Sequence, residues 1–224
     1  MSLSRFQSLF RSRSSAVPED RLEGRPPRGL RLLPDFVTPQ EREEISAWIA
    51  AHVTWSGGSF SGNRKETYLE PSRPLPEWGR ALGRRLREAG IFDADPDFFQ
   101  LLSYQAGQGI ARHVDRESLG EVVAGLTLGS SCVYEFARAG KRDAFEFALE
   151  ERKDVSARLL LLAGDLYVIS GGARHRWEHG VPFAKEDQFG GRVYPRSDGC
   201  SAIWRRVDRD APWVAEFARS QVSA

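Results

Sequence analysis

Residues 98–136 read FFQLLSYQAGQGIARHVDRESLGEVVAGLTLGSSCVYEF, and this stretch decides the fold class. Its short apolar runs alternate with short segments rich in Gly, Asp and Ser, and the same pattern recurs further along the chain. Many short strands at this spacing are typical of a β-sandwich or a jelly roll. The strands expected from the apolar runs cover residues 101–104, 110–114, 122–128, 133–136, 144–147, 159–162 and 166–169.

A His-x-Asp pair, His113 and Asp115, lies inside this stretch, and a further histidine, His179, follows at a distance. In an extended strand, residues two apart point to the same face, so the pair places an imidazole beside a carboxylate. Two imidazoles and one carboxylate form the facial triad that binds Fe(II) and leaves positions open for oxygenase chemistry. The spacing alone is a weak signal because His-x-Asp occurs by chance. We expect His113, Asp115 and His179 to be the metal ligands and the catalytic centre.

The sequence around these histidines resembles that of the AlkB family of iron- and 2-oxoglutarate-dependent dioxygenases. The matching motifs are a Tyr-x-x-Gly run at Tyr104–Gly107, a Leu-Gly-Ser run at Leu128–Ser130, and a Gly-x-x-Arg-x-x-Trp-x-His segment at Gly171–His179. The resemblance begins near Gly29 and extends over most of the chain. It implies a single AlkB-like dioxygenase domain over residues 29–224.

The resemblance implies a mainly β fold, the double-stranded β-helix or jelly roll, with N-terminal helices buttressing one sheet. It also implies Fe(II), 2-oxoglutarate and O2, which supply the oxidative chemistry while the protein orients them. Three residues match positions that contact 2-oxoglutarate in the family: Tyr104, Ser201 and Arg205. Arg205 is expected near the iron, beside Asp115.

One strand of the cosubstrate site departs from the family pattern. Gly199 stands where the family has the arginine that pairs with the distal carboxylate of 2-oxoglutarate, and Leu102 replaces an asparagine that also contacts it. Removing one partner of a buried charge pair costs about 2–5 kcal/mol of binding. We therefore predict that a nearby cation, Arg196 as first choice, supplies the charge. The alternative is a different cosubstrate or a different pose.

The substrate class follows from the resemblance, which implies oxidative demethylation or hydroxylation with alkylated nucleic-acid bases as the default substrate. The candidate pocket residues are Glu117, Arg174, His175, Trp177 and Tyr68. Each has a structural alternative, such as a solvated loop for Glu117 and a core position for Trp177. A hydroxylase of a small molecule or a protein side chain is a second hypothesis. A third is a catalytically lapsed module that only binds, although the intact triad argues against it.

The N-terminal half predicts scaffold helices. After a strand over residues 30–36, the segment Thr38–Glu41 has the form of a capping box with proline at the first helical position. A second helix is expected over residues 76–89, ended by a glycine. Between the helices, residues 55–74 are rich in Gly, Ser and Pro and are expected to be a loop, either a substrate lid or an ordinary surface loop.

Composition limits the partners. The 32 basic and 31 acidic residues give a net charge of +1, which provides no global electrostatic case for nucleic acid or membrane and leaves a local basic face open. The two cysteines, Cys132 and Cys200, lack the pattern of a disulfide framework or a zinc site and indicate a reducing compartment. We expect a monomeric, cytoplasmic protein without a membrane segment, because no apolar run approaches the required length.

The first 28 residues combine arginine and serine with few apolar side chains. This composition is typical of a disordered tail, because the segment offers little to pack. It also faintly resembles an organellar transit peptide. We expect the tail to end at residue 28.

Overall fold

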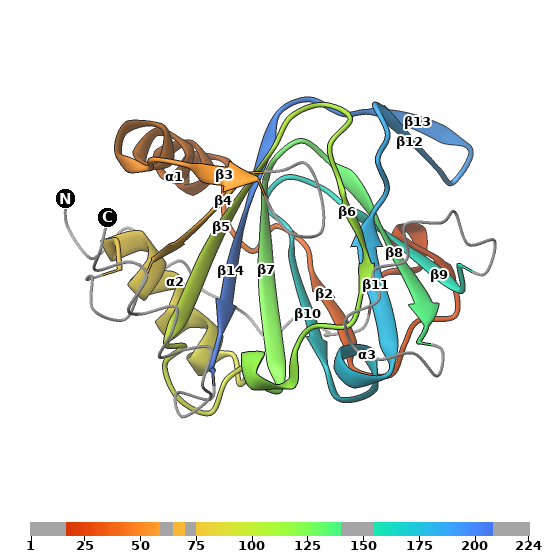
Figure 1. Cartoon of the computed structure of the whole chain (residues 1–224), viewed down its shortest axis with the longest axis horizontal. Helices are drawn as coiled ribbons and strands as arrows, with labels where there is room; N and C mark the ends of the chain where they lie inside the picture. The colour runs from red at the N-terminus through yellow and green to blue at the C-terminus, as the bar shows by residue number, and fades with distance from the viewer. Residues whose placement is uncertain (1–16, 59–64, 70–74, 140–154, 208–224) are drawn as a thin grey trace.

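The computed structural model describes residues 17–58, 65–69, 75–139 and 155–207. Two antiparallel sheets lie across from each other, as Figure 1 shows. The major sheet has the strand order β2-β10-β7-β14-β5-β4-β3, and the minor sheet has the order β1-β9-β8-β11-β6. The predicted jelly roll is therefore confirmed, with an additional hairpin formed by β12 and β13.

The strands of the major sheet are β2 (Leu30–Leu33), β3 (Ser56–Gly58), β4 (Lys65–Leu69), β5 (Phe98–Tyr104), β7 (Val122–Gly129), β10 (Leu166–Ser170) and β14 (Gly199–Arg205). Those of the minor sheet are β1 (Leu22–Gly24), β6 (Ile110–His113), β8 (Cys132–Arg138), β9 (Ala157–Leu161) and β11 (Trp177–Val181). The hairpin pairs β12 (Glu186–Phe189) with β13 (Arg192–Pro195). The helices are α1 (Pro39–His52), α2 (Glu77–Glu88) and α3 (Gly171–His175), with 3-10 turns η2 (Glu19–Arg21) and η3 (Glu117–Leu119).

Two hydrophobic cores lie on opposite faces of the major sheet. The outer core joins the sheet to α1 and α2, and its rings include Trp78 and Trp204 with centroids 6.3 Å apart. The inner core fills the space between the two sheets and contains residues of both, such as Ile203 and Phe136. The expectation that N-terminal helices buttress one sheet is confirmed (Figure 1). The candidate site described below lies next to this inner core.

The N-terminal helices begin and pack as their sequences predict. The Thr38 side chain accepts a hydrogen bond from the backbone of Glu41, whose carboxylate accepts one in return, so the capping box is present. Glu41 also pairs with Arg85 of α2 at 2.6 Å, and both side chains are buried. This pair fixes α1 to α2 behind the major sheet.

Two expectations about irregular segments need correction. The expected tail ends too late, because residues 22–24 form β1, which pairs with β9 and belongs to the minor sheet. The expected loop at 55–74 contains β3 and β4, since pairing of β4 with β5 outweighs the local Gly and Ser composition. Residues 1–16 and the strand expected at 144–147 lie outside the described residues.

The hairpin of β12 and β13 covers the outer face of the minor sheet. Phe189 packs there against Val133 and Leu160. Asp187 of the hairpin is buried, accepts a hydrogen bond from the Val133 backbone, and pairs with Arg196 at 2.5 Å. In the described part of the chain, no helix is both long and apolar enough to cross a membrane.

Candidate metal centre and cosubstrate site

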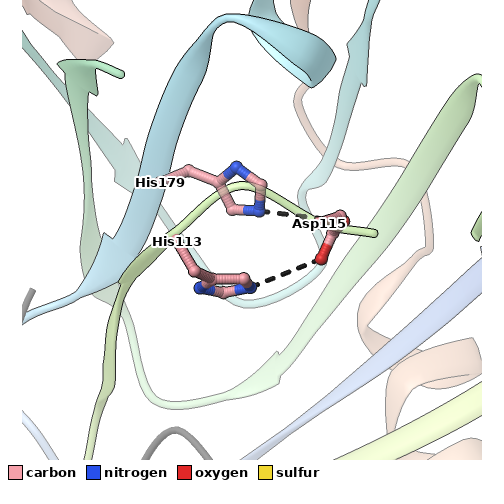
Figure 2. Close-up of side chains that lie close together, drawn as sticks. All are labelled: His113, Asp115 and His179. Carbon is pink, nitrogen blue, oxygen red and sulfur yellow. Dashed lines mark ion pairs between the residues drawn. The ribbon is translucent and has the colours of Figure 1, made fainter. Parts of the chain in front are cut away.

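Three side chains converge at one end of the minor sheet. His113 ends β6, His179 lies opposite it on β11, and Asp115 follows two residues after His113 (Figure 2). Nε2 of His113 is 3.3 Å from one carboxylate oxygen of Asp115, and Nε2 of His179 is 3.8 Å from the other. All three potential ligand atoms lie within 4.8 Å of one another. The structure thus brings the predicted triad together.

The geometry corrects one detail of the sequence argument. β6 ends at His113, so Asp115 lies just beyond the strand rather than within it. Glu117 accordingly does not continue the same strand face, because it begins the turn η3 and is exposed. Asp115 therefore needs contacts other than a β-ladder to hold its carboxylate beside the histidines.

The protonation states suit a divalent metal. Burial lowers the pKa of His179 to about 3, so its ring is neutral near pH 7. Nδ1 of His113 lies 2.8 Å from the Ala111 carbonyl oxygen, and this contact orients Nε2 of the same ring toward Asp115. Burial acts to raise the pKa of Asp115, but Arg205 and the two histidines outweigh it and hold the pKa well below its usual range. Two imidazoles and one carboxylate are a ligand set that fits Fe(II).

Arg205 supports the carboxylate from the major sheet. Its Nη1 donates to Asp115 at 2.6 Å, and both side chains are buried. Its Nε is also buried and has no hydrogen-bond partner within the described residues. A buried cationic donor without a partner, next to the triad, fits an anionic ligand, as the carboxylate of 2-oxoglutarate is.

Arg174 holds the loop that carries Asp115. This fully buried guanidinium donates to the Asp115 carbonyl at 2.8 Å, to the Gly120 carbonyl at 3.0 Å and to the Arg116 carbonyl. Gly120 can adopt its φ of +83° without strain, and a Cβ there would lie 1.7 Å from the Arg206 carbonyl oxygen. Arg174 is thus a positioning residue for the triad rather than a residue at the pocket mouth.

Replacing Arg174 by Met should weaken Mn(II) binding by about 10- to 100-fold, the usual effect of losing a contact that orients a metal ligand. Mn(II) serves as a redox-stable substitute for Fe(II), and calorimetric titration measures its affinity. The matched control is Arg176→Met, because Arg176 is exposed and two residues away. Equal metal affinity in both variants would show that the loop holds Asp115 without Arg174.

The predicted cosubstrate residues lie at the far end of the inner face from Arg205. Tyr104 pairs with Gly199 across β5 and β14, and Ser201 pairs with Leu102. Tyr104, Ser201 and Gly199 are partly exposed, although they sit at inward positions of their strands. This end of the inner face is therefore in contact with solvent.

Arg196 does not offer a free charge to this site. Its guanidinium makes two hydrogen bonds to the Asp187 carboxylate, both at 2.5 Å, and further ones to the carbonyls of Pro182 and Gln108. This correction has a simple cause, because its carboxylate partner belongs to the hairpin, which the sequence analysis did not anticipate.

The remaining candidates for the substrate pocket are dispersed. His175 of α3 forms an ion pair with Glu121 at 2.8 Å. Trp177 packs against the inner core, as expected if it is a core residue and not a substrate contact. Tyr68 lies in β4, and its side chain is outside what the structure describes.

Sequence reasoning missed two tyrosines that face the triad region. Tyr134 of β8 and Tyr167 of β10 are buried in the inner core, and the Tyr134 ring lies 5.6 Å from the His179 ring. Each tyrosine lies within an apolar strand segment, where the sequence alone does not distinguish it from an ordinary core residue. The available signal was alternation, since both occupy inward positions of their strands, and Tyr167 lies opposite Gly125.

Comparison with protein families gives one broad match. The profile of the 2OG-Fe(II) oxygenase superfamily matches residues 49–206, which contain the triad and β14. The described elements from the end of α1 to β14 thus fall inside the matched range.

Relatives at 26–28% identity occur in viruses, plants and animals. The protein L905 of Acanthamoeba polyphaga mimivirus is 26% identical over 81% of this chain and 86% of its own length. An Arabidopsis thaliana protein named alkylated DNA repair protein ALKBH8 homolog is 28% identical over 84% of this chain. A Xenopus tropicalis protein named tRNA (carboxymethyluridine(34)-5-O)-methyltransferase alkbh8 is 27% identical over 72%. The chain spans only 61% of the plant protein and 26% of the frog protein.

Solved structures share the fold at lower identity. The structure of OsALKBH1 aligns with a TM-score of 0.55 and 15% identity, covering 80% of this chain and 98% of that one. A Pseudomonas putida prolyl-4-hydroxylase aligns with a TM-score of 0.52 and 14% identity, covering 80% and 93%. Both likenesses concern the arrangement of strands.

Proposed function

This chain belongs to the 2OG-Fe(II) oxygenase superfamily and is a dioxygenase that uses Fe(II), 2-oxoglutarate and O2, and on that premise we propose that its substrate is an alkylated or otherwise modified base in a nucleic acid. The reaction is an oxidative demethylation or a hydroxylation of the base substituent. The names of two relatives support this substrate class, because they refer to alkylated DNA repair and to a modified tRNA uridine.

The chain's own residues hold and orient the reacting groups. Bound Fe(II), with 2-oxoglutarate and O2, supplies the oxidation of a substrate C–H bond. His113, Asp115 and His179 hold the metal, and Arg205 keeps the Asp115 carboxylate in place. The His113 side chain is 18% exposed whereas that of His179 is 3% exposed, so a substrate reaches the metal from the His113 side. The inner core excludes water from the opposite side.

The observation that carries this proposal is a group of exposed arginines around the triad. Hydrogen bonds tie their segments to α3 and the adjoining strand β11. The Arg174 side chain donates to the Arg116 carbonyl, the Ala173 backbone N–H to the Arg28 carbonyl, and the Ala139 backbone N–H to the Arg176 carbonyl. We call these exposed side chains the arginine group: Arg28, Arg116, Arg138 and Arg176. Phosphates of a nucleic-acid backbone are the ligands that such a group attracts.

The wild-type protein should consume 2-oxoglutarate in step with loss of the modified base from one member of a panel of oligonucleotides. The panel comprises single-stranded DNA, RNA and tRNA fragments that carry alkylated bases. Binding should weaken steeply with salt, because each phosphate contact releases counterions. Arg116→Glu and Arg176→Glu should each lower the slope of log affinity against log salt by about one.

Arg192→Glu provides the matched control, because Arg192 is an exposed arginine on the distant hairpin and should leave the slope unchanged. Turnover that is insensitive to salt and to both reversals would contradict the role of the arginine group. If no oligonucleotide is oxidised while small molecules or peptides stimulate 2-oxoglutarate consumption, the substrate is a small molecule or a protein side chain.

A further inference from the structure

The two inner tyrosines meet in the centre of the jelly roll. Tyr134 comes from the minor sheet and Tyr167 from the major sheet, and their ring centroids are 4.8 Å apart. Their hydroxyl groups are hydrogen-bonded to each other. Tyr134 also contacts the His179 ring edge-on at 5.6 Å, so the pair lies next to the metal centre.

The backbone of the major sheet makes room for this pair. Tyr167 is paired across the ladder with Gly125, and Ile203 of β14 lies on the other side of Gly125 in the same row. A Cβ at Gly125 would lie 2.3–2.5 Å from ring and hydroxyl atoms of Tyr167, closer than any real Cβ contact. The phenol can therefore lie flat over the β7 backbone only because residue 125 is glycine.

The pair has an unused hydrogen-bond donor. A single hydrogen bond between two hydroxyls uses one of their two protons, so the pair keeps one proton that this bond does not use. A tyrosine hydroxyl ordinarily keeps its proton at neutral pH, so the pair can act as a donor. A buried donor without an acceptor is costly and normally has a partner such as a ligand.

The pair also lies in the right part of the interior. Along β14, the metal-side residue is Arg205, and the accessible end is marked by Ser201 and Gly199. Tyr167 belongs to the row of Ile203, between these two ends. A cosubstrate bound between the metal centre and the accessible end would therefore lie beside this pair.

We infer that the Tyr134–Tyr167 pair donates a hydrogen bond to the distal carboxylate of 2-oxoglutarate and so takes over the role of the arginine that Gly199 replaces. Tyr104 and Ser201 complete this neutral binding site at the accessible end. The inference rests on the cosubstrate of the superfamily and is independent of the substrate class. Its test therefore contains no nucleic acid.

The experiment measures binding of 2-oxoglutarate to the Mn(II)-loaded protein by anaerobic calorimetry. It compares this ligand with 2-oxopentanoate, which keeps the 2-oxo acid and has a methyl group in place of the distal carboxylate. Tyr167→Phe should weaken binding of 2-oxoglutarate by roughly 10- to 100-fold, the usual value of a hydrogen bond to a charged group. Binding of 2-oxopentanoate should stay the same, because the lost hydroxyl has nothing to contact.

Two further variants secure the result. Tyr134→Phe repeats the test if Tyr167→Phe does not fold, and a Mn(II) titration checks that each variant keeps an intact metal site. Tyr194→Phe, on the outer hairpin, is the matched control and should bind both ligands normally. An equal effect on both ligands, no effect on either, or a wild-type protein that binds no 2-oxoglutarate would each overturn the inference. Failure of the oligonucleotide assay alone would not affect it.

Discussion

His113→Ala should abolish stoichiometric Mn(II) binding, with a loss of affinity greater than about 100-fold. The reason is that contacts which only orient a ligand already contribute 10- to 100-fold, so loss of a ligand itself must exceed this range. The fold should survive, because His113 is partly exposed at the end of β6 and its removal leaves no closed cavity. Calorimetry gives the affinity, and circular dichroism checks the fold.

His175→Ala is the control for this prediction. His175 lies four residues before His179 in sequence, yet it pairs with Glu121 and is not part of the triad. Asp115→Asn extends the test, since it keeps the size of the side chain and removes its charge. Normal metal uptake by both His113→Ala and Asp115→Asn would show that other residues bind the metal.

Arg205→Met should lower the free energy of unfolding of the metal-free protein by about 3–5 kcal/mol, the range for a buried charge pair that loses one partner. The Asp115 carboxylate then stays buried without its 2.6 Å cationic partner. Saturating Mn(II) should recover part of this loss, because the ion returns positive charge to the carboxylate. Urea unfolding in the presence of chelator and in the presence of Mn(II) measures both values.

The adjacent residue provides a matched control. Arg206 also pairs with an aspartate, Asp93, but this pair lies on the surface, where the two side chains are 43% and 85% exposed. Exposed pairs contribute little to stability, so Arg206→Met should be nearly neutral. If Arg205→Met and Arg206→Met destabilise the protein equally, or if Mn(II) recovers nothing, the Asp115–Arg205 pair does not have the assigned role.

The triad could be predicted from sequence because its signal is local. His113 and Asp115 are held together by two peptide units, and the third histidine lies in a recognisable segment. The start of helix α1 was equally predictable, since its capping box is a property of consecutive residues. Such local features do not depend on the tertiary structure of the rest of the chain.

The contacts that orient the site could not be predicted in the same way. Arg174 finds its acceptors on a loop more than 50 positions earlier, a separation at which sequence carries no distance information. Tyr134 and Tyr167 belong to different sheets, so their contact depends on how the sheets face each other. Arg196 was assigned to the cosubstrate because it stands near β14 in sequence, whereas tertiary structure gives it Asp187.

The place of β14 in the major sheet has a consequence for biosynthesis. This strand is the last of the sheet to be translated, yet it lies between β7 and β5 in the middle of it. Until it docks, the nascent chain presents two unpaired strand edges, which are templates for aggregation. Pairings this distant in sequence also form slowly. The Arg205 guanidinium reaches Asp115 only with this final strand, so a nascent chain completes its metal centre at the end of folding rather than during translation of the triad.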